Sequence, residues 1–143
     1  MCTKDEMTPF DLFSEWYQQA GRITFWRRIL TWLYPPAVIH QPDAMTLATV
    51  SSEGRPSARI LLLKGVEKGR FIFFTNYTSQ KAYELVHNPN VALIFHWAFP
   101  ERQVRVEGVA EKVSRDVSLA YWKKRPRGSQ LSGMASPQSS VIF

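Results

Sequence analysis

The stretch MTLATVSSEGRPSARILLL, residues 45–63, predicts a β-hairpin. Its first part, 45–51, alternates in polarity with a period of two, which places successive side chains on opposite faces of a strand. Its last part, 57–63, contains an aliphatic run, and the EGRP segment between the two parts has the glycine and proline that favour a turn. We therefore expect two strands joined by this turn.

Two cations, Arg59 and Lys64, border the aliphatic run. A buried cation is costly unless it is paired, so each of them requires an anion. Because side chains alternate along a strand, the two cations are expected on opposite faces and in different roles. The planar guanidinium of Arg59 suits a phosphate, and the point charge of Lys64 suits a second anion or an electron-accepting ring.

Further strands are predicted after this hairpin. The VEKG segment is expected to be a turn, and β-rich patterns follow at 70–76, 90–97 and 103–113. Strands that are joined by tight turns, with one short helix among them, favour an antiparallel sheet that curls into a barrel or a sandwich.

Two helices are predicted within this β-rich part and after it. Ser79 is placed to cap a short helix that ends at Asn88-Pro89, and Ser114 is placed to cap a helix that ends before Pro126. The last stretch, 127–143, is polar and rich in turn-forming residues, so we expect no regular element there.

Residues 1–40 are predicted to form a helical segment in front of the main domain, 41–143. A first amphipathic helix is expected from near Pro9 to a stop at Gly21. A second helical face is expected over 22–34. We favour docking of this second helix on the core or on a second subunit, and the alternative is a helix lying in a membrane interface.

Composition limits the choice of function. The chain has 143 residues, of which 45% are hydrophobic and 21% charged, so one globular domain is expected. No apolar segment reaches the roughly 20 residues needed to span a bilayer, and no secretory signal is recognisable. The lone cysteine allows no disulfide within the chain, and we expect a cytoplasmic protein. The net charge of +6 suggests acidic partners, namely phosphorylated small molecules, nucleic acid or an anionic membrane.

Several chemistries have no support in the sequence. The three histidines are not clustered with cysteines or carboxylates at metal-ligand spacing, so no metal site is predicted. A glycine-rich phosphate loop, a dinucleotide fingerprint and a nucleophile elbow are also missing. The chemistry that the sequence still supports is the binding of anions by side chains on a β scaffold. Thr75 precedes a helix N-terminus with Lys81 in its first turn, and this combination favours an anion.

Five segments together are similar to the pyridoxamine 5′-phosphate oxidase family. They are, in order, AMTLATVSSEGRPSARILLLKG, FFTNYTSQKAYEL, NPNVALIFHW, ERQVRVEGVAEKVS and YWKKRPRGSQLSGMASPQSS. The resemblance implies a mainly β protein with flanking helices, whose fold is an antiparallel FMN-binding split β-barrel. It also implies a homodimer that holds FMN at the subunit interface. The activity that it implies is FMN-dependent oxidation of pyridoxamine or pyridoxine 5′-phosphate to pyridoxal 5′-phosphate, with O2 as the electron acceptor. It implies no nucleic-acid partner.

The resemblance also implies which residues form the site. The cofactor-binding residues would be Arg59, Ile60, Leu61, Leu62, Lys64, Thr75, Gln80, Lys81, Gln103, Gln138 and Ser139. The substrate-binding residues would be Lys64, Tyr121, Arg125 and Ser129. Because the flavin supplies the hydride chemistry, no catalytic acid–base residue is predicted.

The sequence departs from the family at several points. An acidic residue is common where Gln41 precedes Pro42, and residues 22–40 have no clear counterpart. Gln80 stands where the family usually has an arginine. The sequence ends at QSSVIF, where the family continues into a region with a tryptophan, an arginine and an Arg-x-His element, so we expect a domain shortened at its C-terminal end.

Two alternatives remain open. One is a non-catalytic or degenerate FMN-binding dimer. The other is a basic β-barrel that binds single-stranded nucleic acid, with Phe73 and Trp97 as stacking platforms.

Overall fold

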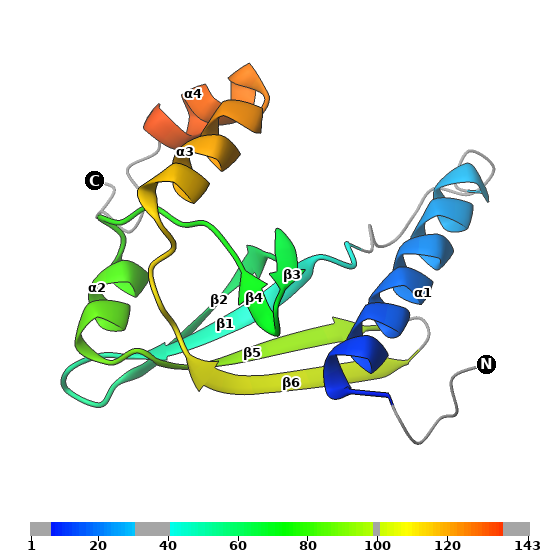
Figure 1. Ribbon diagram of the computed structural model, residues 1–143, viewed down its shortest axis with the longest axis horizontal. Coiled ribbons are helices and arrows are strands. Elements are labelled where there is room, and N and C mark those ends of the chain that lie inside the picture. Colours follow the sequence, from blue (N-terminus) through cyan, green and yellow to red (C-terminus); the bar gives the residue numbers. More distant parts are fainter. Residues whose placement is uncertain (1–6, 31–40, 99–100, 136–143) are drawn as a thin grey trace. The chain divides into compact units, whose positions relative to one another are not determined.

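The computed structural model describes residues 7–30, 41–98 and 101–135 (Figure 1). Along the chain, the elements in these ranges are α1 (Pro9–Leu30), β1 (Ala44–Val50), β2 (Pro56–Leu62), β3 (Gly65–Glu67), β4 (Arg70–Ile72), α2 (Gln80–His87), β5 (Asn90–Trp97), β6 (Arg102–Val109), α3 (Arg115–Lys124) and α4 (Arg127–Ala135). The chain divides into two compact units. Unit 1 comprises Met1–Leu47, Arg59–Phe73 and Leu93–Val106, and unit 2 comprises Ala48–Ala58, Phe74–Ala92 and Glu107–Phe143.

The predicted hairpin of 45–63 is confirmed as β1 and β2. They belong to a four-stranded antiparallel sheet with the order β2-β1-β5-β6. At the turn, the Ser51 amide donates to the Arg55 carbonyl oxygen at 2.9 Å, and Gly54 adopts a φ of 79° that favours glycine. The predicted alternation is present in β1, where Met45, Leu47 and Thr49 are buried.

The second, two-stranded sheet differs from the prediction. Part of VEKG is not turn but strand β3, which pairs antiparallel with β4 so that Glu67 faces Arg70. Lys68 and Gly69, with φ of 48° and 73°, form the tight turn between them, as hairpins of this length require. Because β3 offers only three partners, the predicted strand over 70–76 ends at Ile72. Strand β6 also ends earlier than predicted, at Val109.

Helix α1 begins with two reciprocal hydrogen bonds. The Asp11 amide donates to Thr8 Oγ1 at 3.2 Å, and the Thr8 amide donates to Asp11 Oδ2 at 3.0 Å, as in a capping box. The predicted stop at Gly21 was wrong, since α1 continues to Leu30. An interior glycine costs about 1 kcal/mol but retains its amide, so a single glycine does not end a helix. Residues 31–34 of the predicted second helix lie outside the described residues.

Aromatic packing forms the core of unit 1. Phe13 of α1 is 4% exposed, and its ring centroid lies 4.9 Å from that of Phe71 and 5.0 Å from that of Phe95, both in edge-to-face contact. Trp97, which is fully buried, donates its Nε1–H to the Pro42 carbonyl oxygen at 2.9 Å. The face of α1 that carries Phe13 is therefore fixed on β4 and β5.

Helices α3 and α4 are consecutive in unit 2. Ser114 caps α3 as predicted, accepting from the Val117 amide at 3.4 Å, and α3 ends before Pro126. The prediction of an irregular stretch from 127 onward was wrong in part, because α4 occupies its beginning. Pro126 precedes α4, where a missing amide has no cost, and the Gln130 side chain donates to the Trp122 carbonyl oxygen at 2.8 Å. None of the helices in the described ranges is long and apolar enough to cross a membrane.

Candidate functional site

Strand β2 presents two different faces. Exposure alternates along it, and Ile60 and Leu62 are 72% and 37% exposed. Arg59 is on the less exposed face, where its Nη1 donates to the Leu47 carbonyl oxygen at 3.4 Å. The alternation of side chains predicted for this strand is therefore confirmed. Leu61 is half-buried.

Lys64 lies after β2, separated from it by Leu63, and has an anionic partner. Its Nζ lies 3.5 Å from Asp43 Oδ2, and its amide donates to the Ile72 carbonyl oxygen at 2.8 Å. Burial, and to a lesser extent the charge of Asp43, raises the pKa of the nearby Tyr17 phenol above 10.0. A cavity of about 320 Å³ in unit 1 is lined by Phe13, Ser14, Tyr17, Gln18, Leu63, Lys64, Gly65 and Val66.

The first turn of α2 carries two predicted cofactor ligands. Gln80 is exposed, whereas Lys81 is only 8% exposed. Ser79 is the N-cap residue of α2 and Asn88 its C-cap, as predicted, but Ser79 does not cap through its side chain. Its side chain makes no cap bond to α2, and its hydroxyl instead donates to the Asn76 carbonyl oxygen at 2.7 Å. The Ser79 hydroxyl therefore does not cap α2, and the Ala82 amide donates to the Ser79 backbone carbonyl oxygen at 2.9 Å. Thr75 lies half-buried before this turn.

A buried carboxylate, which the sequence analysis missed, lies one turn further along α2. Glu84 is 6% exposed and accepts hydrogen bonds from Thr49 Oγ1, from Ser57 Oγ at 2.8 and 2.9 Å, and from Gln80 Nε2 at 2.8 Å. These donors come from β1, β2 and α2, so the carboxylate joins the helix to the hairpin. The available signal was the position of Glu84 three residues after Lys81, on the buried face of α2.

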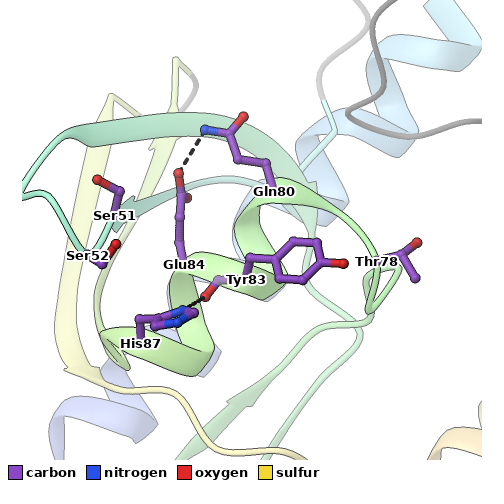
Figure 2. Close-up of a pocket in the computed structure, with 7 residues that line it drawn as sticks. All are labelled: Ser51, Ser52, Thr78, Gln80, Tyr83, Glu84 and His87. Atoms are coloured by element: carbon purple, nitrogen blue, oxygen red, sulfur yellow. Dashed lines mark hydrogen bonds between the residues drawn. The ribbon is translucent and has the colours of Figure 1, made fainter.

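Beside this network lies a cavity of about 430 Å³ (Figure 2). It is lined by residues of the β1–β2 turn, of α2 and of the segment before α2, namely Ser51, Ser52, Thr78, Gln80, Tyr83, Glu84 and His87. His87 Nδ1 lies 2.8 Å from the Tyr83 carbonyl oxygen, and since that oxygen only accepts, the ring proton is on Nδ1.

Tyr121, a predicted substrate residue, is held by aromatic stacking. Its ring is parallel to that of Phe74, with centroids 3.8 Å apart and an interplanar angle of 2°. The Arg125 guanidinium carbon lies 6.0 Å from the Tyr121 ring centroid and 5.5 Å from that of Trp122. The predicted proximity of Tyr121 and Arg125 is thus present, although Arg125 is the C-cap of α3. Phe74 was not among the predicted residues.

The remaining predicted residues are distributed over both units. Gln103 is exposed on β6 in unit 1, and Ser129 is half-buried on α4 in unit 2. Unit 1 thus holds Arg59, Ile60, Leu61, Leu62, Lys64 and Gln103, and unit 2 holds Thr75, Gln80, Lys81, Tyr121, Arg125 and Ser129. Gln138 and Ser139 lie outside the described residues. Within the described ranges, no three His, Cys, Asp or Glu residues are placed to hold a metal ion.

Solved structures define the class of fold. PhzG from Burkholderia lata, solved with tetrahydrophenazine-1-carboxylic acid, is similar with a TM-score of 0.70 and 27% identity, covering 85% of this chain and 60% of PhzG. An FMN-binding protein from Nostoc punctiforme, related to pyridoxamine 5′-phosphate oxidase, has a TM-score of 0.55 and 22% identity over 67% of this chain and 57% of its own. The predicted split-barrel fold class is confirmed.

Sequence comparison then gives the family. The family model described as pyridoxamine 5′-phosphate oxidase matches residues 36–143. A pyridoxine/pyridoxamine 5′-phosphate oxidase of Burkholderia mallei is 48% identical over 134 residues, and that of Burkholderia thailandensis is 47% identical, each match covering 94% of this chain. The chain belongs to the pyridoxamine 5′-phosphate oxidase family, as the resemblance predicted. It spans 56% of the length of these relatives.

Proposed function

We propose that this chain is the FMN-binding part of a cytoplasmic oxidase that converts pyridoxamine or pyridoxine 5′-phosphate to pyridoxal 5′-phosphate. The observation that carries the proposal is the 48% identity with such an oxidase over 94% of the chain. Bound FMN would supply the hydride acceptor, with O2 as the final acceptor. The protein would supply binding and orientation.

The hydrogen-bond donors and cations on β2 and at the start of α2 fit the phosphate of a flavin mononucleotide. We propose that Arg59 and Lys81 bind its phosphate, with Gln80 and the first amides of α2 as additional donors. The Ser79 hydroxyl makes no cap bond to α2 and donates to Asn76 instead, which supports this role. Along the ring and its side chain, the proposed contacts are Ile60, Leu61, Leu62, Lys64, Thr75, Gln103, Gln138 and Ser139.

A homodimer with FMN between its subunits is part of the proposal. Ile60 is 72% exposed and Leu62 37% exposed on β2. Burying such side chains is favourable by about 25 cal/mol per Å² of apolar surface, so a flavin ring or a second subunit on this face would be stabilised. The exposed aliphatic side chains therefore support an occupant there.

For the substrate, we propose Lys64, Tyr121, Arg125 and Ser129 as ligands of the phosphate and the pyridine ring. Lys64 would exchange its partner Asp43 for a substrate group. The side chains of this ion pair are each about 30% exposed, and an ion pair that solvent reaches contributes little free energy. The stack on Phe74 fixes the ring plane of Tyr121 and thereby the direction in which its hydroxyl is offered.

Two experiments test these proposals. Protein loaded with FMN is mixed with pyridoxine 5′-phosphate without oxygen, and bleaching of the flavin absorbance is the expected result. If the absorbance persists, the oxidase activity is excluded while flavin binding stands. For the cofactor site, R59Q and K81Q are expected to weaken FMN binding, and R55Q is the control because Arg55 is an exposed turn residue paired with Glu53. Unchanged FMN uptake in R59Q and K81Q would exclude the proposed phosphate ligands.

A second candidate is oxidation of another anionic aromatic molecule. The similarity to PhzG, whose structure holds tetrahydrophenazine-1-carboxylic acid, favours it. A reduced tricyclic carboxylic acid that bleaches the flavin, while pyridoxine 5′-phosphate does not, would select this candidate.

A further inference from the structure

Helix α2 has too few residues to hold its own position. It spans eight residues, and isolated helices shorter than about 12–15 residues are marginal in water. The direction of its first turn, which carries Gln80 and Lys81, therefore depends on contacts with the rest of unit 2. Within the described part of α2, three side chains are buried, namely Lys81, Ala82 and Glu84.

Of these side chains, Glu84 has contacts that determine the orientation of the helix. One carboxylate oxygen accepts from Gln80 and Ser57, and the other accepts from Ser57 and Thr49. Thr49 is fully buried on β1, and Ser57 is on β2, so the bonds join α2 to both strands of the hairpin. Hydrogen bonds are directional, and a buried network of them specifies one arrangement more strictly than apolar contacts do.

The bond from Gln80 adds a second consequence. Its Nε2 donates to Glu84 Oε1 at 2.8 Å, the bond drawn as a dashed line in Figure 2. One of its two amide protons is therefore already used. The side chain is thereby kept along the helix, one turn from the carboxylate. The other amide proton remains for a ligand at the first turn of α2.

We propose that Glu84 is a positioning residue for the binding of a phosphate ester at the first turn of α2. It acts through Gln80 and through the orientation of the helix, and it does not touch the ligand. This inference rests on the proposed function, because the phosphate ester would be that of FMN.

The test compares two flavins. Riboflavin has the same ring and ribityl chain as FMN and lacks the phosphate, so the ratio of their Kd values isolates the phosphate site. The E84Q variant keeps the size of the side chain but replaces one acceptor oxygen by an N–H donor, which disrupts the bonds from Thr49, Ser57 or Gln80. We expect its Kd for FMN to rise about tenfold, the size of effect that loss of a hydrogen bond to a charged group produces, and its Kd for riboflavin to stay unchanged.

Controls make each outcome decisive. E53Q is the matched control, since Glu53 is exposed at the turn of the same hairpin, and its FMN affinity should equal that of the wild type. T49V removes one hydrogen-bond donor to Glu84 at nearly the same side-chain volume, and it should weaken FMN binding less than E84Q does. If E84Q does not fold, T49V takes its place in the comparison of FMN and riboflavin. Hydrogen exchange of the α2 amides in the flavin-free protein should accelerate in E84Q.

Three results would count against the proposal in distinguishable ways. Equal loss of FMN and riboflavin affinity in E84Q would show a general structural role and overturn it. Unchanged affinity for both flavins would overturn it as well. Failure of the wild-type protein to bind FMN would refute the proposed function itself, and this inference with it.

Discussion

Replacement of Phe13 by alanine is predicted to have the largest effect on the stability of unit 1. The side chain is 4% exposed, and its ring lies between 4.9 and 5.9 Å from those of Phe71, Phe95, Trp97 and Tyr17. Truncation of a buried phenylalanine costs about 3–5 kcal/mol, from lost burial and from the cavity that remains. Such a loss is a large part of the 5–15 kcal/mol that stabilises a typical domain.

Urea unfolding followed by tryptophan fluorescence measures this loss, because Trp97 packs against Phe13 and reports on the same cluster. The control is F10A on the same helix, where the side chain is 39% exposed and about 1 kcal/mol is expected. The reasoning fails if F13A destabilises the protein no more than F10A does, since α1 would then not be fixed by this aromatic contact.

Two further predictions concern charged groups. D43N removes the partner of Lys64, and since exposed pairs contribute about 0–1 kcal/mol, the Tm should change little. The affinity of D43N for pyridoxine 5′-phosphate, measured by calorimetry, should be higher than that of the wild type, and a lower affinity would contradict the proposed role of Lys64. The pKa of Tyr17, measured by absorbance titration, should fall toward 10.0 without reaching it, because the phenol stays buried. For Asp11, hydrogen bonds from the Thr8 side chain and amide lower the pKa below 3.8, so the charge stabilises the fold above that pH. D11N should therefore have a lower Tm than the wild type at neutral pH, and the difference should vanish as the pH falls through the folded pKa; a difference independent of pH would refute the assignment.

Local sequence signals predicted the hairpin and several helix ends correctly. The period of two in β1, the turn at Gly54 and the cap at Ser114 all depend on residues close together in the chain. The errors occurred where a distant or alternative partner decides the outcome. Strand β3 forms because it pairs with β4, and Ser79, although it is the N-cap of α2, donates its hydroxyl to Asn76 and not to the helix.

The candidate site shows the same limit. The sequence predicted the alternation of side chains along β2, since alternation is a local property, but β2 ends at Leu62, so this alternation does not fix the face of Lys64. It did not indicate that Lys64 pairs with Asp43, or that Thr49 and Ser57 converge on Glu84, because these contacts join residues far apart in the sequence. The family resemblance supplied residue roles, and the physical partners of those residues came from the structure.

The turn between β3 and β4 constrains how this protein can diverge. Gly69 has a positive φ, and an added Cβ would lie 3.2 Å from Cε2 of Phe10 on α1. Any larger residue at 69 would therefore be strained and would also push against Phe10. In related proteins that have lost this glycine, we expect a smaller side chain at the position of Phe10, so that the two sites covary across an interval of nearly sixty residues.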